Sequence, residues 1–455
     1  MVGTSWRRGA VSLSVLLMAC AVFVPAWARA LSFSSEVDVA PEAPGDQKNP
    51  SIVAAPTGVV YLAWDAAVEG VRQIFVARAQ EVAEPFGAAV QVTQGPADRT
   101  DPVLAWAPGG PLVLAWVDST GGDADIFVAK AEGSWPAFTA PVEASDGPGP
   151  SAQTRPALVV DGHGAVHVAW EDERTDHDIR VASGPVGSLT FGGSVRVNDD
   201  PGNAWQHEPA LDVDAQGILY AAWWDRRDVD PYVYVATSSD GGATFGANRR
   251  VTATAGPEFE PALAVHGGRV YAVWQDGRSG VGRDIYLASA ATPDGSFGDG
   301  VRVNGGAGSS NQRAPSLAVA GDGAVSVVWE DHRNGVFEVY HAVSRDGGRT
   351  FEEGRVHQAP GAAFLEKPQP VVAVAGDGTV LVAWEDQRPA DSRIAFVRSL
   401  AVAGPNGIDM GLVVILIIIV AGAVVVWALY RRKRGRDASG RPGLHRGGVR
   451  KRASR

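Results

Sequence analysis

The chain of 455 residues has an ordinary globular composition, with 45% hydrophobic and 20% charged residues and a net charge of −11. The charge is unevenly distributed, because residues 31–410 hold 26 basic and 50 acidic residues, whereas residues 431–455 hold 11 basic and one acidic. A region of net charge −24 repels nucleic acid, which excludes nucleic acid as its partner. The single cysteine, Cys20, excludes an intramolecular disulfide and a cysteine-based metal site.

The first 30 residues resemble a secretory signal. Arg7 and Arg8 precede an apolar run over residues 11–24, and the small-residue site Ala28-Arg29-Ala30 follows it. This order predicts a signal peptide over residues 1–30. Residues 17–20, Leu-Met-Ala-Cys, also resemble a lipobox, so processing as a lipoprotein is the alternative.

Residues 31–400 repeat one pattern seven times. Each unit has a proline, an apolar segment, a glycine-containing turn and a second apolar segment that ends in Trp. The period is about 53 residues, which is in the range of propeller blades. The seven tryptophans are Trp64, Trp116, Trp170, Trp223, Trp274, Trp329 and Trp384. We expect each of them to pack between neighbouring sheets.

One unit shows four predicted strands. Residues 156–160 form a short apolar strand, and alternating apolar residues follow over 166–170 after an Asp-Gly turn. Residues 179–182 and 191–197 supply the third and fourth strands. The sequence therefore predicts an all-β, seven-bladed β-propeller with four-stranded blades.

The two ends of the repeat region predict how the ring closes. The seventh unit runs from Lys367 to about Ser399 and has no fourth strand of its own. Residues 33–39 resemble the fourth strand of other units. We therefore expect this N-terminal segment to complete the last blade and to remove an open sheet edge.

The C-terminal residues predict a membrane anchor. Residues 411–430 carry no charge and have the length that a helix needs to cross a bilayer. Residues 401–410 form a short linker before this span, and the basic residues 431–455 follow it. Positive charge after the span predicts a cytoplasmic tail, hence a single-pass protein of the cell membrane with its propeller outside the cytoplasm.

Two segments match the Asp-box pattern Ser-x-Asp-x-Gly-x-Thr-aromatic. Their residues are Ser238, Asp240, Gly242, Thr244 and Phe245 in one box, and Ser344, Asp346, Gly348, Thr350 and Phe351 in the other. The chain from 31 to 400 thereby resembles the sialidase-like, BNR-repeat propeller superfamily. In that family the box is a structural turn between the third and fourth strands of a blade, and we expect the same role here.

The resemblance also implies a hydrolase hypothesis. Sialidases of this family use an arginine cluster for the substrate carboxylate, a Tyr activated by Glu, and an acidic Asp. The first unit has Lys48-Asn49-Pro50 where the family has an Arg-Ile-Pro-like start, while Arg313-Ala314-Pro315 has a similar form in the sixth unit. No Tyr and Glu pair stands out.

Non-repeating residues at repeating positions are the candidate ligand-binding residues. They stand where the loop from strand four meets the next inner strand, which approaches the axis of a propeller. These charged candidates are Asp101, Arg155, Glu208, Glu260, Arg313 and Lys367. Trp205 and Phe259 are candidate stacking surfaces beside them. Carboxylates opposite guanidinium groups suit a polar, sugar-like ligand.

A further pattern, Trp-x-Asp-x-Arg, occurs in five units and indicates a structural role. We expect the Asp to fix a turn and the Arg to pair across blades. The acidic turns around Asp172, Asp176 and Asp178, and around Asp225, Asp228 and Asp230, supply oxygen ligands of the type that calcium prefers. Calcium is thus the one cofactor to consider, and no motif predicts another.

The sequence favours a membrane-anchored module that binds polysaccharide or a surface protein. Its surface topology, intact propeller repeat and missing catalytic signatures support this hypothesis. The alternatives are a glycoside hydrolase of exo-sialidase type and an envelope scaffold protein, because propellers host all three functions.

Overall fold

The computed structural model describes residues 31–133, 135–145, 151–174, 176–292, 295–306, 310–356, 368–387 and 391–400. The predicted signal peptide, linker, span and tail lie outside these residues. Within the part of the chain that is described, no helix is long and apolar enough to cross a membrane.

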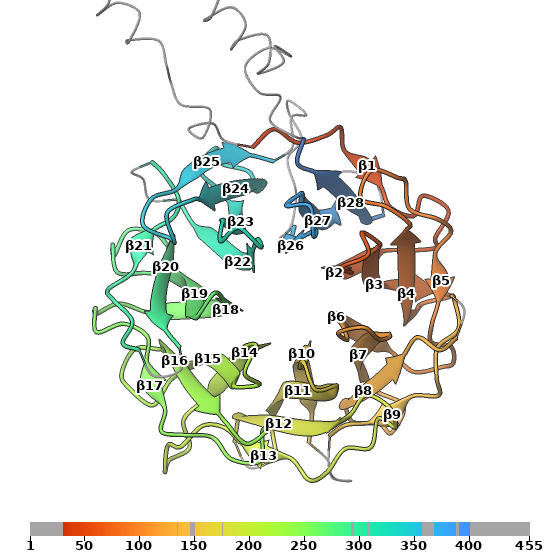
Figure 1. Ribbon diagram of the computed structural model, residues 1–455, viewed down its shortest axis with the longest axis horizontal. Coiled ribbons are helices and arrows are strands. Elements are labelled where there is room, and N and C mark those ends of the chain that lie inside the picture. Colours follow the sequence, from red (N-terminus) through yellow and green to blue (C-terminus); the bar gives the residue numbers. More distant parts are fainter. Residues whose placement is uncertain are drawn as a thin grey trace, which may run out of the picture. The chain divides into compact units, whose positions relative to one another are not determined.

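The described residues form seven four-stranded antiparallel sheets arranged as blades around one axis (Figure 1). Blades 1 and 2 comprise β2 (Gln47–Ala54), β3 (Val60–Val68), β4 (Val71–Ala79), β5 (Val90–Gln91), β6 (Arg99–Trp106), β7 (Leu112–Asp118), β8 (Asp125–Lys130) and β9 (Val142–Glu143). Blades 3 and 4 comprise β10 (Gln153–Val160), β11 (Ala165–Asp172), β12 (Asp178–Pro185), β13 (Val195–Arg196), β14 (Gln206–Val213), β15 (Leu219–Asp225), β16 (Tyr232–Ser238) and β17 (Arg249–Arg250).

Blades 5 and 6 comprise β18 (Glu258–His266), β19 (Arg269–Asp276), β20 (Asp284–Ala291), β21 (Val301–Arg302), β22 (Gln312–Val319), β23 (Val325–Asp331), β24 (Glu338–Ser344) and β25 (Glu352–Arg355). Blade 7 comprises β26 (Val371–Val374), β27 (Val380–Asp386), β28 (Arg393–Arg398) and β1 (Val37–Asp38). The prediction of a seven-bladed propeller with four strands per blade is confirmed, and the first strand of each blade lies next to the axis (Figure 1).

The N-terminal strand closes the ring, as the repeat pattern predicted. β1 pairs with β28 so that Val37 lies opposite Phe396 in the antiparallel register. Beyond the strand, the Val39 N–H donates to the Ile394 carbonyl at 2.9 Å, and Phe33 forms a further bridge to Ser399. The last blade therefore contains both ends of the described chain, and its outer edge is supplied by residues that precede the first blade.

The repeating tryptophans form the contacts between blades. All seven are fully buried. Trp64 of blade 1 shares an apolar cluster with Leu381 and Ala383 of blade 7, and Trp170 of blade 3 packs with Val113 and other residues of blade 2. The prediction that these tryptophans pack between neighbouring sheets is confirmed.

The Asp two residues after the Trp anchors the indole. Its carboxylate accepts a hydrogen bond from the Trp Nε1 in blades 2 to 6, as in the Trp223–Asp225 pair at 2.9 Å. In blade 1, Ala66 occupies this position, and Trp64 Nε1 has no hydrogen-bond partner among the described residues. The Asp therefore satisfies a buried donor as well as fixing the turn.

The Arg of this motif pairs mainly within its own blade, which corrects the expectation of pairing across blades. Arg278 and Arg333 each bind the Asp two residues before them and lie over a Tyr of the adjacent strand. Arg227 also reaches the preceding blade, where it contacts Asp199 at 2.6 Å. The Asp lies only two residues before the Arg, so its carboxylate is the nearest partner for the guanidinium.

The two Asp-box segments form equivalent turns between third and fourth strands. Asp240 accepts hydrogen bonds from the N–H and hydroxyl of Thr244 at 2.9 and 2.6 Å, and the Ser238 hydroxyl accepts the Gly242 N–H. Gly242 has a φ of 85°, which a side chain would strain. These hydrogen bonds lower the pKa of Asp240 to about 2, and Asp346 in the second box behaves in the same way.

Ring closure can be tested with two equal substitutions in the N-terminal segment. Val39 is only 4% exposed and packs in the cluster around Trp64, whereas Val37 is 47% exposed. Val39→Ala should lower the free energy of unfolding by roughly 1.5–2 kcal/mol, while Val37→Ala should change it by less than about 0.5 kcal/mol. Urea unfolding of both variants measures the difference. Equal effects would contradict a closing role for this segment.

Candidate ligand-binding site

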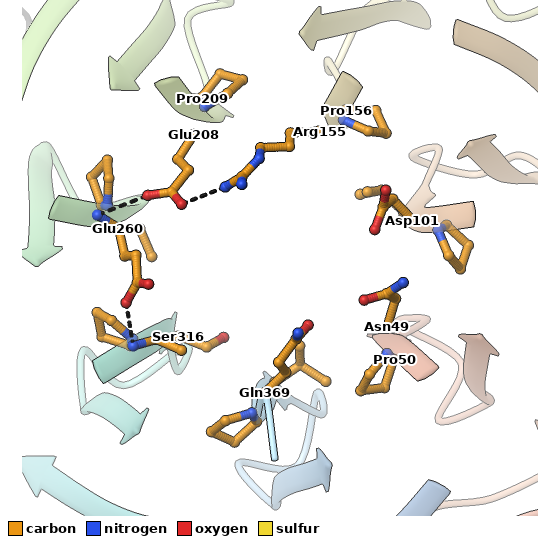
Figure 2. A pocket seen from close by; sticks show the side chains of 18 of the residues that line it. Asn49, Pro50, Asp101, Arg155, Pro156, Glu208, Pro209, Glu260, Ser316 and Gln369 are labelled. Atoms are coloured by element: carbon orange, nitrogen blue, oxygen red, sulfur yellow. Dashed lines mark hydrogen bonds and ion pairs between the residues drawn. The ribbon is translucent and has the colours of Figure 1, made fainter. Parts of the chain in front are cut away.

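The axis of the propeller holds a cavity of about 600 Å³. Its lining comes from the same position of every blade, a residue followed by a proline near the start of the inner strand. These seven ring residues are Asn49, Asp101, Arg155, Glu208, Glu260, Ala314 and Gln369 (Figure 2).

Each ring residue has a positive φ, between 42° and 57°, which is unusual for residues other than glycine. In blades 1 to 6 the register between the first and second strands shifts at this point, as in a β-bulge. A bulge re-aims the side chain of the extra residue. It thus directs the ring side chains of these six blades toward the axis.

Acidic side chains join neighbouring blades at the ring. In each case a carboxylate of one blade accepts the backbone N–H of the ring residue of the next blade. These carboxylate–amide links are Glu385 to Asn49 (2.8 Å), Asp65 to Asp101 (3.4 Å), Glu171 to Glu208 (2.6 Å), Glu208 to Glu260 (3.1 Å), Glu260 to Ala314 (2.7 Å) and Glu330 to Gln369 (3.0 Å). Two of the ring carboxylates, Glu208 and Glu260, therefore already have a structural role before any ligand binds.

Blade 3 departs from this pattern. Val117 occupies the position from which blade 2 would offer a carboxylate, so the described residues show no such link to Arg155. The Arg155 guanidinium instead contacts Glu208 and lies 3.4 Å from Glu171. Its side chain is 54% exposed, so it faces the cavity as well as its two acidic partners.

Burial and charge set the protonation of the ring acids. Burial raises the pKa of Asp101, against the effects of the Thr100 hydroxyl and Arg155. Burial also raises the pKa of Glu208, helped by the nearby Glu260 and opposed by Arg155. Both carboxyl groups consequently hold their protons to higher pH than free side chains do.

The cavity brings together four of the six charged candidates. Asp101, Arg155, Glu208 and Glu260 line it. Arg313 does not, because the bulge places Ala314 at the ring and leaves the Arg313 guanidinium over the ring of Phe337 at 4.8 Å. Lys367 lies outside the described residues.

The ring position of blade 7 is Gln369, followed by Pro370. The choice of Lys367 rested on Pro368, which is not the proline that follows a ring residue. The prediction of Lys367 as the residue at the axis is therefore wrong: a second Xaa-Pro pair follows directly, and the positive φ of Gln369 identifies it as the ring position.

Neither predicted stacking residue, Trp205 or Phe259, lines the cavity, but both belong to a larger aromatic row. Trp205 contacts His207, His207 contacts Trp224, and Trp224 contacts Phe259, with ring centroids 5.9, 4.4 and 5.4 Å apart. Trp205 is 50% exposed. His207 and Trp224 were not singled out from the sequence, although His207 directly precedes a ring residue and Trp224 follows a repeating Trp.

Trp224 joins the aromatic row to the ring. Its indole Nε1 donates to the Glu208 carboxylate at 2.8 Å. Trp224 stands at the position that carries the linking acid in other blades. Glu208 therefore supplies the carboxylate link to the next blade instead. The row is therefore connected to the Arg155–Glu208 pair through this hydrogen bond.

Glu171, His177 and His207 form the one cluster of metal-ligand type found among the described residues, with donor atoms within 4.8 Å of one another. The acidic turns considered for calcium do not form such a cluster. Asp172 and Asp225 bind the Trp and Arg of their own motif, and Asp178 pairs with Arg196 at 2.9 Å.

No family model and no curated protein matches the chain. Solved structures match it at low identity. A protein of unknown function from Dyadobacter fermentans has 13% identity and a TM-score of 0.50, covering 82% of this chain and 99% of its own. An ulvan lyase bound to the saccharide GlcA(1-4)Rha3S has 11% identity and a TM-score of 0.54, covering 79% and 95%.

A mutant of an α-L-arabinofuranosidase from Fusarium graminearum, in complex with an iminosugar inhibitor, has 10% identity and a TM-score of 0.50. The alignment covers 80% of this chain and 97% of that protein. At this level of identity the likeness shows the propeller fold. The role of the axial cavity has to be argued from its own residues.

The carboxylate–amide links make a pH prediction. Burial raises the pKa of Glu385 from 4.5 to about 7, so the folded chain holds this proton more tightly than the unfolded chain. Its contribution to the free energy of unfolding therefore falls as pH rises from about 4.5 to 7. Glu385→Gln keeps an acceptor for Asn49 and removes the charge. It should increase stability at pH 8 by roughly 2 kcal/mol and leave stability at pH 4.5 nearly unchanged.

Urea unfolding at both pH values measures this effect. The control is Glu84→Gln, which alters an exposed glutamate away from the ring and should shift neither value. A Glu385→Gln variant that is equally destabilised at both pH values would contradict the buried charge as the cause.

Proposed function

We propose that the chain is a carbohydrate-binding propeller whose axial cavity and aromatic row bind a saccharide. The observation that carries the proposal is the continuity between exposed Trp205, the rest of the aromatic row and the polar Arg155–Glu208 pair. A sugar ring has apolar C–H faces and a polar rim. Flat aromatic surfaces next to a few fixed polar groups match both parts.

The charges at the cavity favour a neutral saccharide over an acidic one. Arg155 is the single cation of its lining among the described residues, and its guanidinium is already engaged by Glu208 and Glu171. The carboxyl groups of Asp101, Glu208 and Glu260 face the same space. A uronate or sialate carboxylate would meet net negative charge there, whereas sugar hydroxyls can donate to these oxygens.

The same lining argues against the exo-sialidase alternative. The discriminating arrangement is two arginines and a carboxylate converging on the axis with a Tyr nearby. Arg313 points elsewhere, and no Tyr lines the cavity within the described part of the chain. The residues that line the cavity thus support saccharide binding better than hydrolysis through a Tyr nucleophile.

The scaffold alternative needs an exposed apolar patch. The exposed large apolar side chains of the described residues are instead spread over several parts of the propeller: Val37, Trp205, Val229, Val281, Val301 and Leu400.

We include in the proposal that the propeller acts at the cell surface, anchored by residues 411–430. The ulvan lyase, which has this fold, binds the acidic saccharide GlcA(1-4)Rha3S, so it supports saccharide binding by the fold and not the choice of a neutral ligand.

Binding of neutral oligosaccharides to the purified chain tests the proposal. A glycan array selects the ligand, and calorimetry then compares variants. Arg155→Ala and Trp205→Ala should each weaken binding at least about tenfold, because one removes the cavity's cation and the other its exposed stacking surface. The control Val229→Ala alters a side chain that is 96% exposed in the β15–β16 loop, and it should bind as the parent chain does.

Two results would contradict the proposal. One is a glycan array without a neutral ligand. The other is saccharide binding that survives both substitutions. A panel of fluorogenic glycosides, sialosides included, completes the test, and we expect no turnover. Hydrolysis that is lost in Asp101→Asn would favour the hydrolase alternative.

A further inference from the structure

We propose that Glu171, His177 and His207 bind a divalent transition-metal ion, with Zn²⁺ as the first candidate. The three residues come from separate segments of blades 3 and 4, and their donor atoms lie within 4.8 Å of one another. Nothing in the saccharide proposal requires this ion. The site lies beside the axial cavity and shares Glu171 with the ring.

The backbone holds the three segments together. Glu171 stands in β11 next to the repeating Trp170, His177 precedes β12, and His207 stands in β14. The Gln206 N–H donates to the His177 carbonyl at 2.9 Å, which fixes the loop of blade 3 against the inner strand of blade 4. The histidines are therefore neighbours because of blade-to-blade contact, with ring centroids 4.7 Å apart.

The spacing of one donor pair, which is joined by a hydrogen bond, fits a metal ion. Nδ1 of His207 lies 3.1 Å from Oε2 of Glu171. Two ligands at zinc distances on a tetrahedron are about 3.3 Å apart, so both atoms can bind one ion with little movement. Glu171 is buried, which limits the movement open to it.

His177 supplies an independent observation. Its Nδ1 is buried and has no hydrogen-bond partner among the described residues. The closest carboxylate oxygen, on Glu173, is 3.8 Å away, beyond hydrogen-bond length. A buried ring nitrogen without a partner is costly, and coordination of an ion by the imidazole would account for its position.

The donor set selects the class of metal. Two imidazoles and one carboxylate suit zinc and its transition-metal neighbours, whereas calcium requires six to eight oxygens. Three protein ligands leave a coordination position for water or another ligand. The ring of Trp205 lies 5.2 Å from that of His177, so Trp205 is next to the cluster.

Glu171 also has the outer contacts that orient a metal ligand. Its Oε1 accepts the Glu208 N–H at 2.6 Å and lies 3.4 Å from Nε of Arg155. These contacts leave Oε2, the oxygen that faces His207, as the one turned to the ion. Hydrogen bonds of this kind fix the orientation of a ligand and tune its affinity.

Zinc titration of the purified, chelator-treated full-length chain tests the proposal. Calorimetry is done with excess Ca²⁺ present, so that Ca²⁺ occupies the weak, non-specific cation sites of the acidic surface. We expect one tight site that is weakened at least tenfold by His177→Ala and by His207→Ala. His163→Gln, which alters an exposed imidazole in the β10–β11 turn, is the matched control and should bind as the parent does.

Thermal unfolding gives a second readout that separates binding from misfolding. Zn²⁺ should raise the melting temperature of the parent and of His163→Gln, and should leave that of the folded His177→Ala variant unchanged. X-ray absorption of the zinc-loaded chain should show two imidazole ligands. Undiminished tight binding in His177→Ala, or a spectrum with oxygen ligands alone, would overturn the site. Both results are independent of saccharide binding.

Discussion

The propeller depends on the hydrogen bonds that join one blade to the next at the axis. The positive φ of each ring residue turns its N–H toward the preceding blade, and a carboxylate of that blade accepts it at six of the seven junctions described. These amides lie near the axis, where strand pairing does not satisfy them. Buried carboxylates fill that need at an electrostatic cost, which is visible in the raised pKa values of Asp65 and Glu385.

This constraint decides where the axial surface is free to bind a ligand. A carboxylate that links two blades cannot turn toward a ligand without losing its hydrogen bond to the backbone N–H, which would weaken the closed ring. The described residues show no such link between blades 2 and 3, because Val117 stands at the position of the acid. Arg155 is the ring residue at this junction, and its guanidinium contacts Glu208. Two junctions further along, between blades 4 and 5, Trp224 stands at the position of the acid and Glu208 supplies the link instead. The departures from sevenfold repetition therefore fall at Val117, Trp224 and Gln275 of blades 2, 4 and 5, on either side of the candidate residues Arg155 and Glu208.

Sequence periodicity predicted the features that repeat. Seven tryptophans and their spacing were sufficient for the number of blades, and the missing fourth strand of the last unit was sufficient for the closing role of residues 33–39. The ring was predictable where a single proline marks it, as at Asp101 and Glu208. The prediction failed at Arg313 because the bulge places Ala314 at the ring. The side chain one residue earlier, that of Arg313, points away from the axis.

The histidines show a different limit. His177 and His207 are 30 positions apart and belong to different blades, so neither spacing nor local pattern connects them. Their proximity follows from the stacking of one sheet on the next, which sequence reasoning had predicted only for the core tryptophans. A contact of this kind becomes visible once the register of β14 against the β11–β12 loop is known.

Glu171 makes the two proposed sites interdependent. One oxygen supports the ring through the Glu208 N–H, and the other faces His207, so a single buried side chain divides its two acceptors between fold and ligand. Charge drawn toward an ion at the second oxygen weakens the hold of Glu171 on Arg155, whose other partner is Glu208. The guanidinium would then be more available to the axial cavity. If both proposals hold, metal occupancy and saccharide affinity would be coupled through geometry that the closed ring already imposes.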